Sequence, residues 1–134
     1  MTLTETCIAL TIMVTTVAVS TPSLLRSREI YELQSAARMV ESRMQSARVH
    51  AITRNEDCRI NVTSSTTYAV ECQESTWETI DTVALPRGIT VTASARPEFH
   101  ERGNVAPTAT ITVWNRSGRS LRVIVNINGR VRIQ

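Results

Sequence analysis

The sequence predicts an α+β fold in which one long N-terminal helix precedes a small antiparallel β-sheet domain. Residues 6–25 carry no charge, apolar residues follow a helical period from residue 30 to residue 51, and alternating β-branched residues begin after Asn55. A chain of 134 residues has room for about one domain. We therefore expect a helix over residues 1–54 and an antiparallel β globular domain over residues 55–134.

The first 25 residues contain a single charged residue, Glu5. The uncharged stretch that follows has about the length of a helix that crosses a bilayer core. It lacks the positive n-region and the small-x-small cleavage site of a secretory signal peptide. A carboxylate beside such a stretch is costly in lipid unless it is paired, so Glu5 is a candidate functional residue. Its obvious partner is an α-amino group at Met1, on this chain or on a neighbouring copy.

The second half of the expected helix, residues 26–54, is amphipathic. Its apolar stripe, at steps of three and four residues, is Ile30, Leu33, Ala37, Val40, Met44, Ala47 and Ala51. A helix over residues 1–54 is roughly 80 Å long at 1.5 Å per residue, which is too long for the β domain to cover. The hydrophobic half, residues 1–25, is therefore expected to pack in a membrane or against other copies of itself.

The rest of the chain is expected to form strands separated by turns. The expected strands are 58–62, 68–72, 79–85, 89–93, 108–114, 121–127 and 130–133. Asn128-Gly129 lies between two alternating runs and is the strongest hairpin signal in the chain. Residues 94–107 are expected to form a long surface connection.

The three cysteines divide into a pair and a single residue. Cys58 and Cys72 lie symmetrically about Ser65, so a hairpin centred there would place them opposite each other. A disulfide between them would contribute on the order of 3 kcal/mol and is favoured if the domain is exported to an oxidising compartment. Two reduced core cysteines are the alternative. Cys7 is expected to be a packing residue of the apolar segment.

The N-terminus resembles the mature N-terminus of type IV pilins and type II secretion pseudopilins. The resemblance rests on Met1-Thr2-Leu3-Thr4-Glu5, the apolar helix and Pro22, with Met at position 1 and Thr at position 4 as departures. It implies a processed chain, cut by a prepilin peptidase and N-methylated at Met1. It also implies that Glu5 neutralises a neighbouring subunit's terminal amine and that Pro22 marks a bend or a melted stretch. An unrelated membrane anchor with a chance Glu is the alternative.

Two later motifs resemble the GspH/FimT branch of that superfamily. They are Leu33-Gln34-Ser35-Ala36-Ala37-Arg38 on the helix and Gly129-Arg130-Val131-Arg132 near the C-terminus. The resemblance implies a structural subunit that lies in the inner membrane before assembly. Afterwards it would enter a homo-oligomeric helical filament, or one shared with other pilins. That filament would be an extracellular pilus or a periplasmic pseudopilus of type II secretion.

The basic residues favour an anionic partner at the C-terminus. All 15 are Arg, and no acidic residue follows Glu101. Candidate DNA-binding residues are Arg116, Arg119, Arg122, Arg130 and Arg132. Arg130 and Arg132 alternate with apolar residues, so both should face the same side of a strand. FimT-like minor pilins use a Gly-Arg-x-Arg element to bind double-stranded DNA during uptake, whereas secretion relatives with similar endings bind none.

The alternative interpretation is that Gly129 serves the turn and that the two Arg pair with Glu29, Glu32 or Glu74 of neighbouring subunits. A solvated arginine face is equally compatible with the pattern.

The sequence contains little that supports catalysis, so we do not expect the protein to be an enzyme or to bind a cofactor. The sequence holds no phosphate-binding glycine loop, no CxxC pair and no nucleophile elbow. His50 is expected to be a surface or partly packed residue. Glu98, His100 and Glu101 are a weak candidate for a metal site in a loop, and no metal is predicted.

Overall fold

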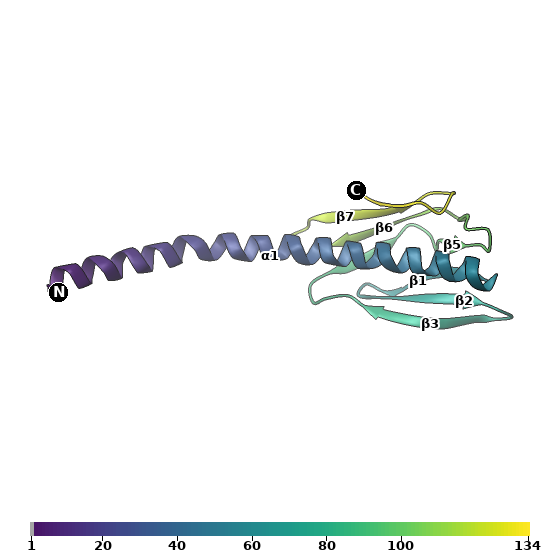
Figure 1. The fold of residues 1–134 in the computed structure, drawn as a ribbon, viewed down its shortest axis with the longest axis horizontal. Helices are drawn as coiled ribbons and strands as arrows, with labels where there is room; N and C mark the ends of the chain where they lie inside the picture. The colour runs from purple at the N-terminus through teal and green to yellow at the C-terminus, as the bar shows by residue number, and fades with distance from the viewer. Residues whose placement is uncertain (1) are drawn as a thin grey trace. The chain divides into compact units, whose positions relative to one another are not determined.

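The computed structural model describes residues 2–134 and contains one long helix followed by antiparallel strands (Figure 1). Helix α1 runs over Leu3–Arg54. The strands are β1 (Asp57–Ser64), β2 (Thr67–Gln73), β3 (Trp77–Ala84), β4 (Thr90–Ala93), β5 (Glu98–Phe99), β6 (Ala109–Trp114), β7 (Ser120–Val125) and β8 (Val131–Ile133). The predicted α+β order, with a long N-terminal helix first, is confirmed.

The strands form two antiparallel sheets, each of four strands, where the sequence predicted one small sheet. The first has the order β3-β2-β1-β5 and the second the order β4-β6-β7-β8. The turn between β1 and β2 links the two sheets, because the carbonyl of Ser65 accepts a hydrogen bond from the backbone N–H of Val91 in β4. Periodicity along the chain reports which face of a strand is buried, but it does not report which strands are neighbours.

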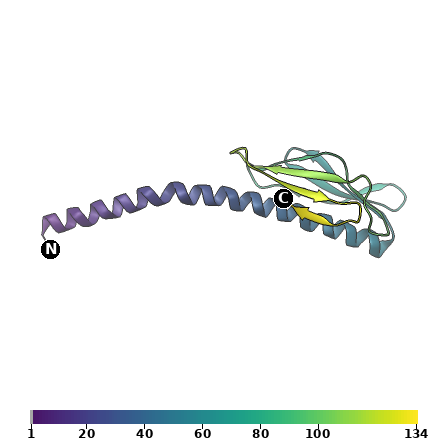
Figure 2. The same ribbon diagram turned by 90° about the horizontal axis from the view of Figure 1, so that it is seen from above.

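The chain divides into two compact units, Met1–Tyr31 and Glu32–Gln134. In the second unit, residues 32–54 of α1 pack against one face of the two sheets. Figure 1 shows β2 and β3 on one side of this helix segment and β6 and β7 on the other, and Figure 2 shows the strands together on one side of it.

The predicted apolar stripe enters the core from Leu33 onward. Its buried members are Leu33, Ala37, Val40, Met44, Ala47 and Ala51, joined by Ala36. The sheets contribute Ile60, Tyr68, Ile111, Val113 and Val123, which are nearly inaccessible to solvent. The alanines on α1 are small, so the helix can approach the sheets closely. This close approach lets a small domain form a continuous hydrophobic core.

The prediction that residues 94–107 form a surface connection is wrong for the central part of that segment. Glu98–Phe99 form β5, which pairs with Cys58 and Arg59 of β1. Phe99 and Val105 are both completely buried and face each other across an isolated bridge. The sequence did not predict this strand, because two residues are too few to show alternation and the surrounding segment is polar and contains two prolines.

Candidate functional site

The N-terminal assembly residues lie at the start of α1, and Met1 itself falls outside the described residues. Glu5 is exposed, and its carboxylate accepts a hydrogen bond from the backbone N–H of Thr2 at 3.0 Å. Thr2 directly precedes the helix, so Glu5 occupies the N3 position of a capping box and satisfies an otherwise free donor. Glu5 therefore has a local role in this structure in addition to the intersubunit role that the resemblance implies.

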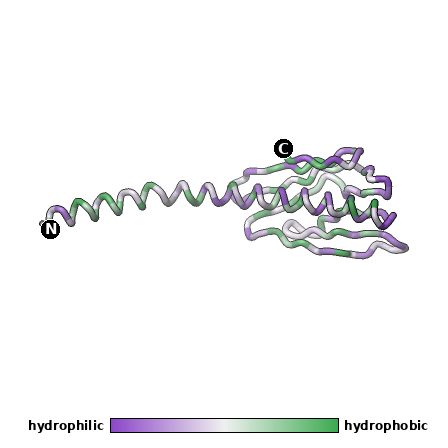
Figure 3. The backbone as a smooth tube through the Cα atoms, in the orientation of Figure 1, coloured by the Kyte–Doolittle hydropathy of each residue, from purple (hydrophilic) through white to green (hydrophobic). Residues whose placement is uncertain are grey.

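The first 29 residues of α1 expose apolar side chains on all sides. The exposed large ones before Glu32 are Leu3, Ile8, Leu10, Ile12, Met13, Val14, Val17, Val19, Leu24, Leu25, Ile30 and Tyr31. Figure 3 shows mainly green and white along the first part of this segment, with purple becoming frequent toward the helix that follows. The helix is long and apolar enough to cross a membrane, and none of its apolar window is buried. A surface of this kind is typical of a site that contacts a membrane or another protein.

Pro22 lies inside α1, which continues through it. Because proline has no backbone N–H, the carbonyl of Ala18 receives no hydrogen bond from this position. The helix is not melted at Pro22 in this structure, and the bend or melting that the resemblance implies for a filament stays a prediction.

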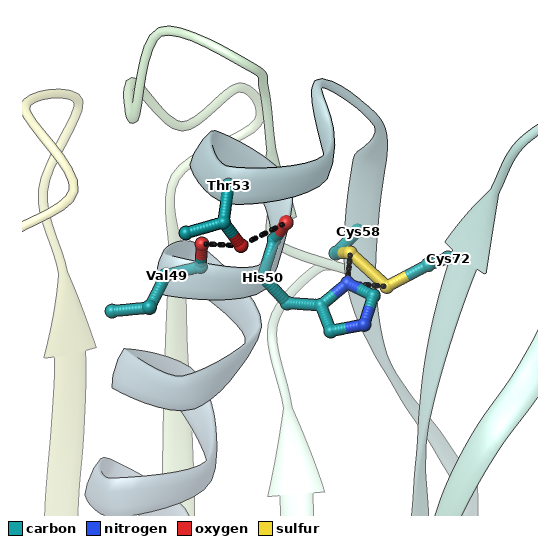
Figure 4. The surroundings of a disulfide bond; sticks show 5 residues. All are labelled: Val49, His50, Thr53, Cys58 and Cys72. Carbon is teal, nitrogen blue, oxygen red and sulfur yellow. Dashed lines mark hydrogen bonds between the residues drawn. A yellow bond between two sulfur atoms is a disulfide. The ribbon is translucent and has the colours of Figure 1, made fainter.

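Cys58 and Cys72 form a disulfide, as predicted, while Cys7 is a free, exposed cysteine. They are register partners on β1 and β2, with their Cα atoms 4.0 Å apart. Figure 4 shows that the imidazole of His50, from α1, points at this disulfide. Its Nδ1 lies 3.7 Å from Cys58 Sγ and 3.8 Å from Cys72 Sγ. His50 is half-buried, as predicted, but its contact with both sulfurs was not.

An ion pair ties α1 to β3 beside this disulfide. Arg43 Nη1 lies 2.8 Å from Asp81 Oδ2, and both side chains remain partly exposed. Tyr68 lies close to this pair and is almost entirely buried. Burial raises the pKa of Tyr68 to about 12, and the charge of Asp81 adds to the rise while that of Arg43 opposes it.

A second polar network covers the outer face of the first sheet. Glu71 accepts hydrogen bonds from Arg59 at 2.6 Å and from Asn61 at 2.8 Å, and the Arg59 guanidinium stacks 3.9 Å from the Trp77 ring. Partial burial alone would raise the pKa of Glu71. The hydrogen bonds from Asn61 and Arg59 and the charge of Arg96 outweigh burial and lower the pKa below its usual value. This network holds β1, β2 and β3 in register.

Three of the five predicted arginines share one face of the second sheet. Arg132 lies opposite Ile124, and Arg122 lies two positions from Ile124 on the same side of β7. Arg130 and Arg132 both line a surface groove of about 410 Å³, together with Ile124 and Asn126. Within residues 2–134 no carboxylate forms an ion pair with these three guanidinium groups.

The other two predicted arginines lie in the turn between β6 and β7. Arg119 is exposed, and the side chain of Arg116 lies over Gly88. They therefore continue the positive charge toward one end of the sheet without joining the face that carries Arg122, Arg130 and Arg132.

Gly129 of the C-terminal motif serves a turn, as the alternative interpretation expected. Its φ is +72°, and a Cβ added there would collide with the Gly103 carbonyl and lie 2.7 Å from Arg48 Nε. Arg48 Nε donates a hydrogen bond to that same carbonyl at 3.1 Å. The β7–β8 turn, the loop around Gly103 and α1 therefore meet at one tightly packed point, which positions Arg130.

The weak metal candidate is rearranged in the structure. Ligand atoms of Asp57, Glu98 and His100 lie within 4.8 Å of one another, whereas Glu101 lines the neighbouring pocket. His100 Nδ1 is 3.0 Å from Asp57 Oδ1. This contact pairs the imidazole with a carboxylate, and Glu98 adds the third ligand atom of the group.

The family is shown by a match to the model described as "Type II transport protein GspH", over residues 36–129. This match covers more than two thirds of the sequence. The chain belongs to the GspH family. A search of curated proteins by sequence gives no significant match.

Solved structures similar to this GspH-family chain have the same fold. The type IV minor pilin FimU of Pseudomonas aeruginosa is 18% identical with a TM-score of 0.65, covering 79% of this chain and 90% of FimU. The minor pseudopilin EpsH of the Vibrio cholerae type 2 secretion system is 14% identical with a TM-score of 0.68, covering 77% of this chain and 96% of EpsH. The fold is thus shared by a pilus component and a secretion component.

Proposed function

We propose that this GspH-family chain is a structural subunit of a type IV pilus or of a type II secretion pseudopilus. The proposal rests on the exposed apolar side chains of residues 3–31. The β domain has a hydrophobic core of its own, and these side chains are not part of it. The helix would lie in the inner membrane before assembly and among the helices of other pilins in the filament afterwards. Prepilin peptidase would generate the mature end, with Met1 N-methylated.

Two variants of Glu5 test the assembly role. Glu5→Ala removes both the carboxylate charge and the helix cap, whereas Glu5→Gln removes the charge and keeps an oxygen that can accept the Thr2 N–H bond. If the charge neutralises a neighbouring amine, both variants should lose incorporation into filaments while the β domain stays folded. Normal incorporation of Glu5→Gln would leave Glu5 only its capping role.

Incorporation is measured by quantitative mass spectrometry of filaments sheared from the cell surface and of periplasmic fractions. A dominant signal in sheared filaments would make this chain a major pilin, and a trace signal would make it a minor component. The same spectra report methylation of Met1. The matched relatives are named as pilins or secretion components, so we keep the prediction that the chain is not an enzyme.

A second candidate function is binding of double-stranded DNA. It is favoured by the three arginines that share one face and have no carboxylate partner within the described residues. Guanidinium groups bind phosphate bidentately, and contacts of this kind track a nucleic-acid backbone without reading its sequence.

Salt dependence tests this second function. If Arg122, Arg130 and Arg132 each contact a phosphate, log K should fall with log salt with a slope of about −3, at about −0.9 for each phosphate. The double variant Arg130→Gln with Arg132→Gln should weaken binding and reduce the slope by about 2. The matched control is Arg38→Gln with Arg54→Gln, which removes the same charge from exposed positions on α1. Equal losses in both double variants would show nonspecific attraction alone.

A further inference from the structure

Three metal-ligating side chains meet at the edge of the first sheet, where β5 pairs with β1. They are Asp57, Glu98 and His100, which are half-buried and have ligand atoms within 4.8 Å of one another. The register pairs Cys58 with Phe99, and both of these side chains are completely buried on one face. Because side chains alternate along a strand, their neighbours Asp57, Glu98 and His100 share the opposite face.

Glu98 brings a negative charge that the described part of the chain does not neutralise. Its register partner on β1 is Arg59, but that guanidinium pairs with Glu71 at 2.6 Å. Among residues 2–134, Asp57 forms an ion pair with His100 and Glu98 forms none. Two carboxylates thus share one imidazole, and a further positive charge between them is favourable.

The cluster borders a pocket that contains further carboxylates. Asp57 and His100 line this surface pocket of about 610 Å³, and its other charged residues are Glu56, Glu74, Glu101 and Arg102. Three additional carboxylates against one guanidinium make the pocket negative, which raises the local concentration of cations. Solvent in the pocket can supply water ligands.

The donor types and their spacing fit zinc. Calcium and magnesium prefer oxygen ligands alone, whereas zinc binds imidazole nitrogen together with carboxylate oxygen. Bonds of about 2.0–2.2 Å at tetrahedral angles separate two zinc ligand atoms by about 3.4 Å. His100 Nδ1 and Asp57 Oδ1 are 3.0 Å apart, and the Glu98 carboxylate lies within 4.8 Å of both. A rotation of the half-buried Glu98 side chain therefore completes a set of three ligands.

We propose that Asp57, Glu98 and His100 bind one zinc ion at this edge of the first sheet. The neutral imidazole carries its proton on Nε2 and offers Nδ1 to the metal, in place of the hydrogen bond that Nδ1 shares with Asp57 Oδ1. Water from the pocket takes the fourth position, as in zinc sites with three protein ligands. The ion joins β1 to the segment after β5, whose Gly103 carbonyl accepts the Arg48 hydrogen bond, so zinc stabilises this end of the domain.

Isothermal titration calorimetry with Zn²⁺ measures binding to the full chain in detergent micelles. The parent protein carries Cys7→Ser, which removes the free thiol, and its Cys58–Cys72 disulfide is kept oxidised. We expect one zinc ion per chain and a higher unfolding temperature when zinc is present. An excess of Ca²⁺ of about tenfold should leave zinc binding unchanged. Absence of saturable zinc binding, or displacement of zinc by Ca²⁺, would overturn the proposal.

Two glutamate variants decide whether the three side chains are the ligands. Glu98→Gln should weaken zinc binding at least about tenfold, because loss of an outer-shell partner alone costs about 10–100-fold. The matched control Glu101→Gln removes the same charge from the pocket wall, so the affinity should stay within about threefold of the parent. Equal losses in the two variants would contradict the assignment, because the acidic surface as a whole would then attract the ion.

The ring signals of the two histidines in NMR spectra identify the imidazole that binds zinc. Zinc should shift the signals of His100 and leave those of His50 in place, because His50 faces the disulfide and lies outside the cluster. His50→Gln assigns the two sets of signals and should bind zinc as the parent does. Zinc binding that leaves the His100 signals unshifted would place the ion elsewhere and reject the site.

Discussion

At the scale of single residues, the hydroxyl of Tyr68 lies in an unfavourable environment. Its side chain belongs to the hydrophobic core and is almost completely buried, and its hydroxyl has no hydrogen-bond partner in the part of the chain that the structure describes. A buried hydroxyl without a partner costs free energy, while the ring contributes to packing. The buried ring therefore stabilises the fold, whereas the unpaired hydroxyl destabilises it.

The raised pKa of Tyr68 predicts a loss of stability in alkali. The pKa is about 12 in the folded chain against 10.0 without burial, so stability is complete below pH 10 and is lost as the pH rises toward 12. Two pKa units correspond to about 3 kcal/mol in the free energy of unfolding. Tyr68→Phe should abolish this component and leave stability at pH 8 equal or higher by about 1 kcal/mol.

Urea unfolding of the detergent-solubilised chain at a series of pH values measures this effect. Tyr31→Phe is the matched control, because Tyr31 is exposed and lies in the other compact unit. An unchanged alkaline loss in Tyr68→Phe would assign that loss to other groups.

At the scale of elements, the C-terminal hairpin depends on a close approach of backbones. Gly129 packs against the Gly103 carbonyl and Arg48, so the turn that precedes β8 is anchored to α1. A further link comes from Val105, whose N–H donates to the Ile127 carbonyl at 2.8 Å. The position of Arg130 and Arg132 is therefore set by contacts far from them in the sequence.

Two glycine variants separate crowding from backbone strain. Gly129 and Gly118 both have positive φ, +72° and +79°, but a Cβ at Gly118 meets nothing within 4 Å. Gly118→Ala should cost only the backbone strain, about 1–2 kcal/mol. Gly129→Ala should cost about 2 kcal/mol more, because something must also shift around the new methyl group. Urea unfolding followed by tryptophan fluorescence gives both values, and equal costs would contradict the crowding.

At the scale of the whole molecule, most of the exposed large apolar side chains lie in the first compact unit, whereas the packed core lies in the second. In the second unit the exposed large hydrophobic side chains are Val49, Ile52, Ile80, Trp114 and Ile127. Five such side chains are normal on the surface of a folded domain, whereas twelve lie before Glu32, most of them within residues 3–25 of α1. Assembly and folding therefore draw on separate parts of the chain.

This separation predicts that residues 32–134 fold without the rest. A chain that begins at Glu32 should be monomeric in detergent-free buffer and have the near-ultraviolet circular dichroism of the full chain, because its core cluster begins at Leu33. The full chain should need detergent. Sedimentation velocity measures the mass, and aggregation of the shortened chain would show that residues before Glu32 contribute to the domain's own stability.

The sequence by itself determined the helix, most of the strands and the disulfide. Each depends on a local signal: a step of three and four residues in α1, alternation in β1 and β2, and two cysteines placed symmetrically about a turn. Burial on one face imposes these periods directly on neighbouring residues, so they can be read without the fold. The N-terminal motif and Gly129-Arg130-Val131-Arg132 likewise pointed to the family that the match to residues 36–129 then showed.

Only the tertiary structure decided which distant segments meet. It divided the strands between two sheets, buried Phe99 on a two-residue strand, aimed His50 at the disulfide and brought Asp57 rather than Glu101 to Glu98 and His100. Each of these contacts joins residues from separate elements. Such contacts are chosen by how the whole core packs and by which backbone groups remain to be paired, and no local period along the chain records that choice.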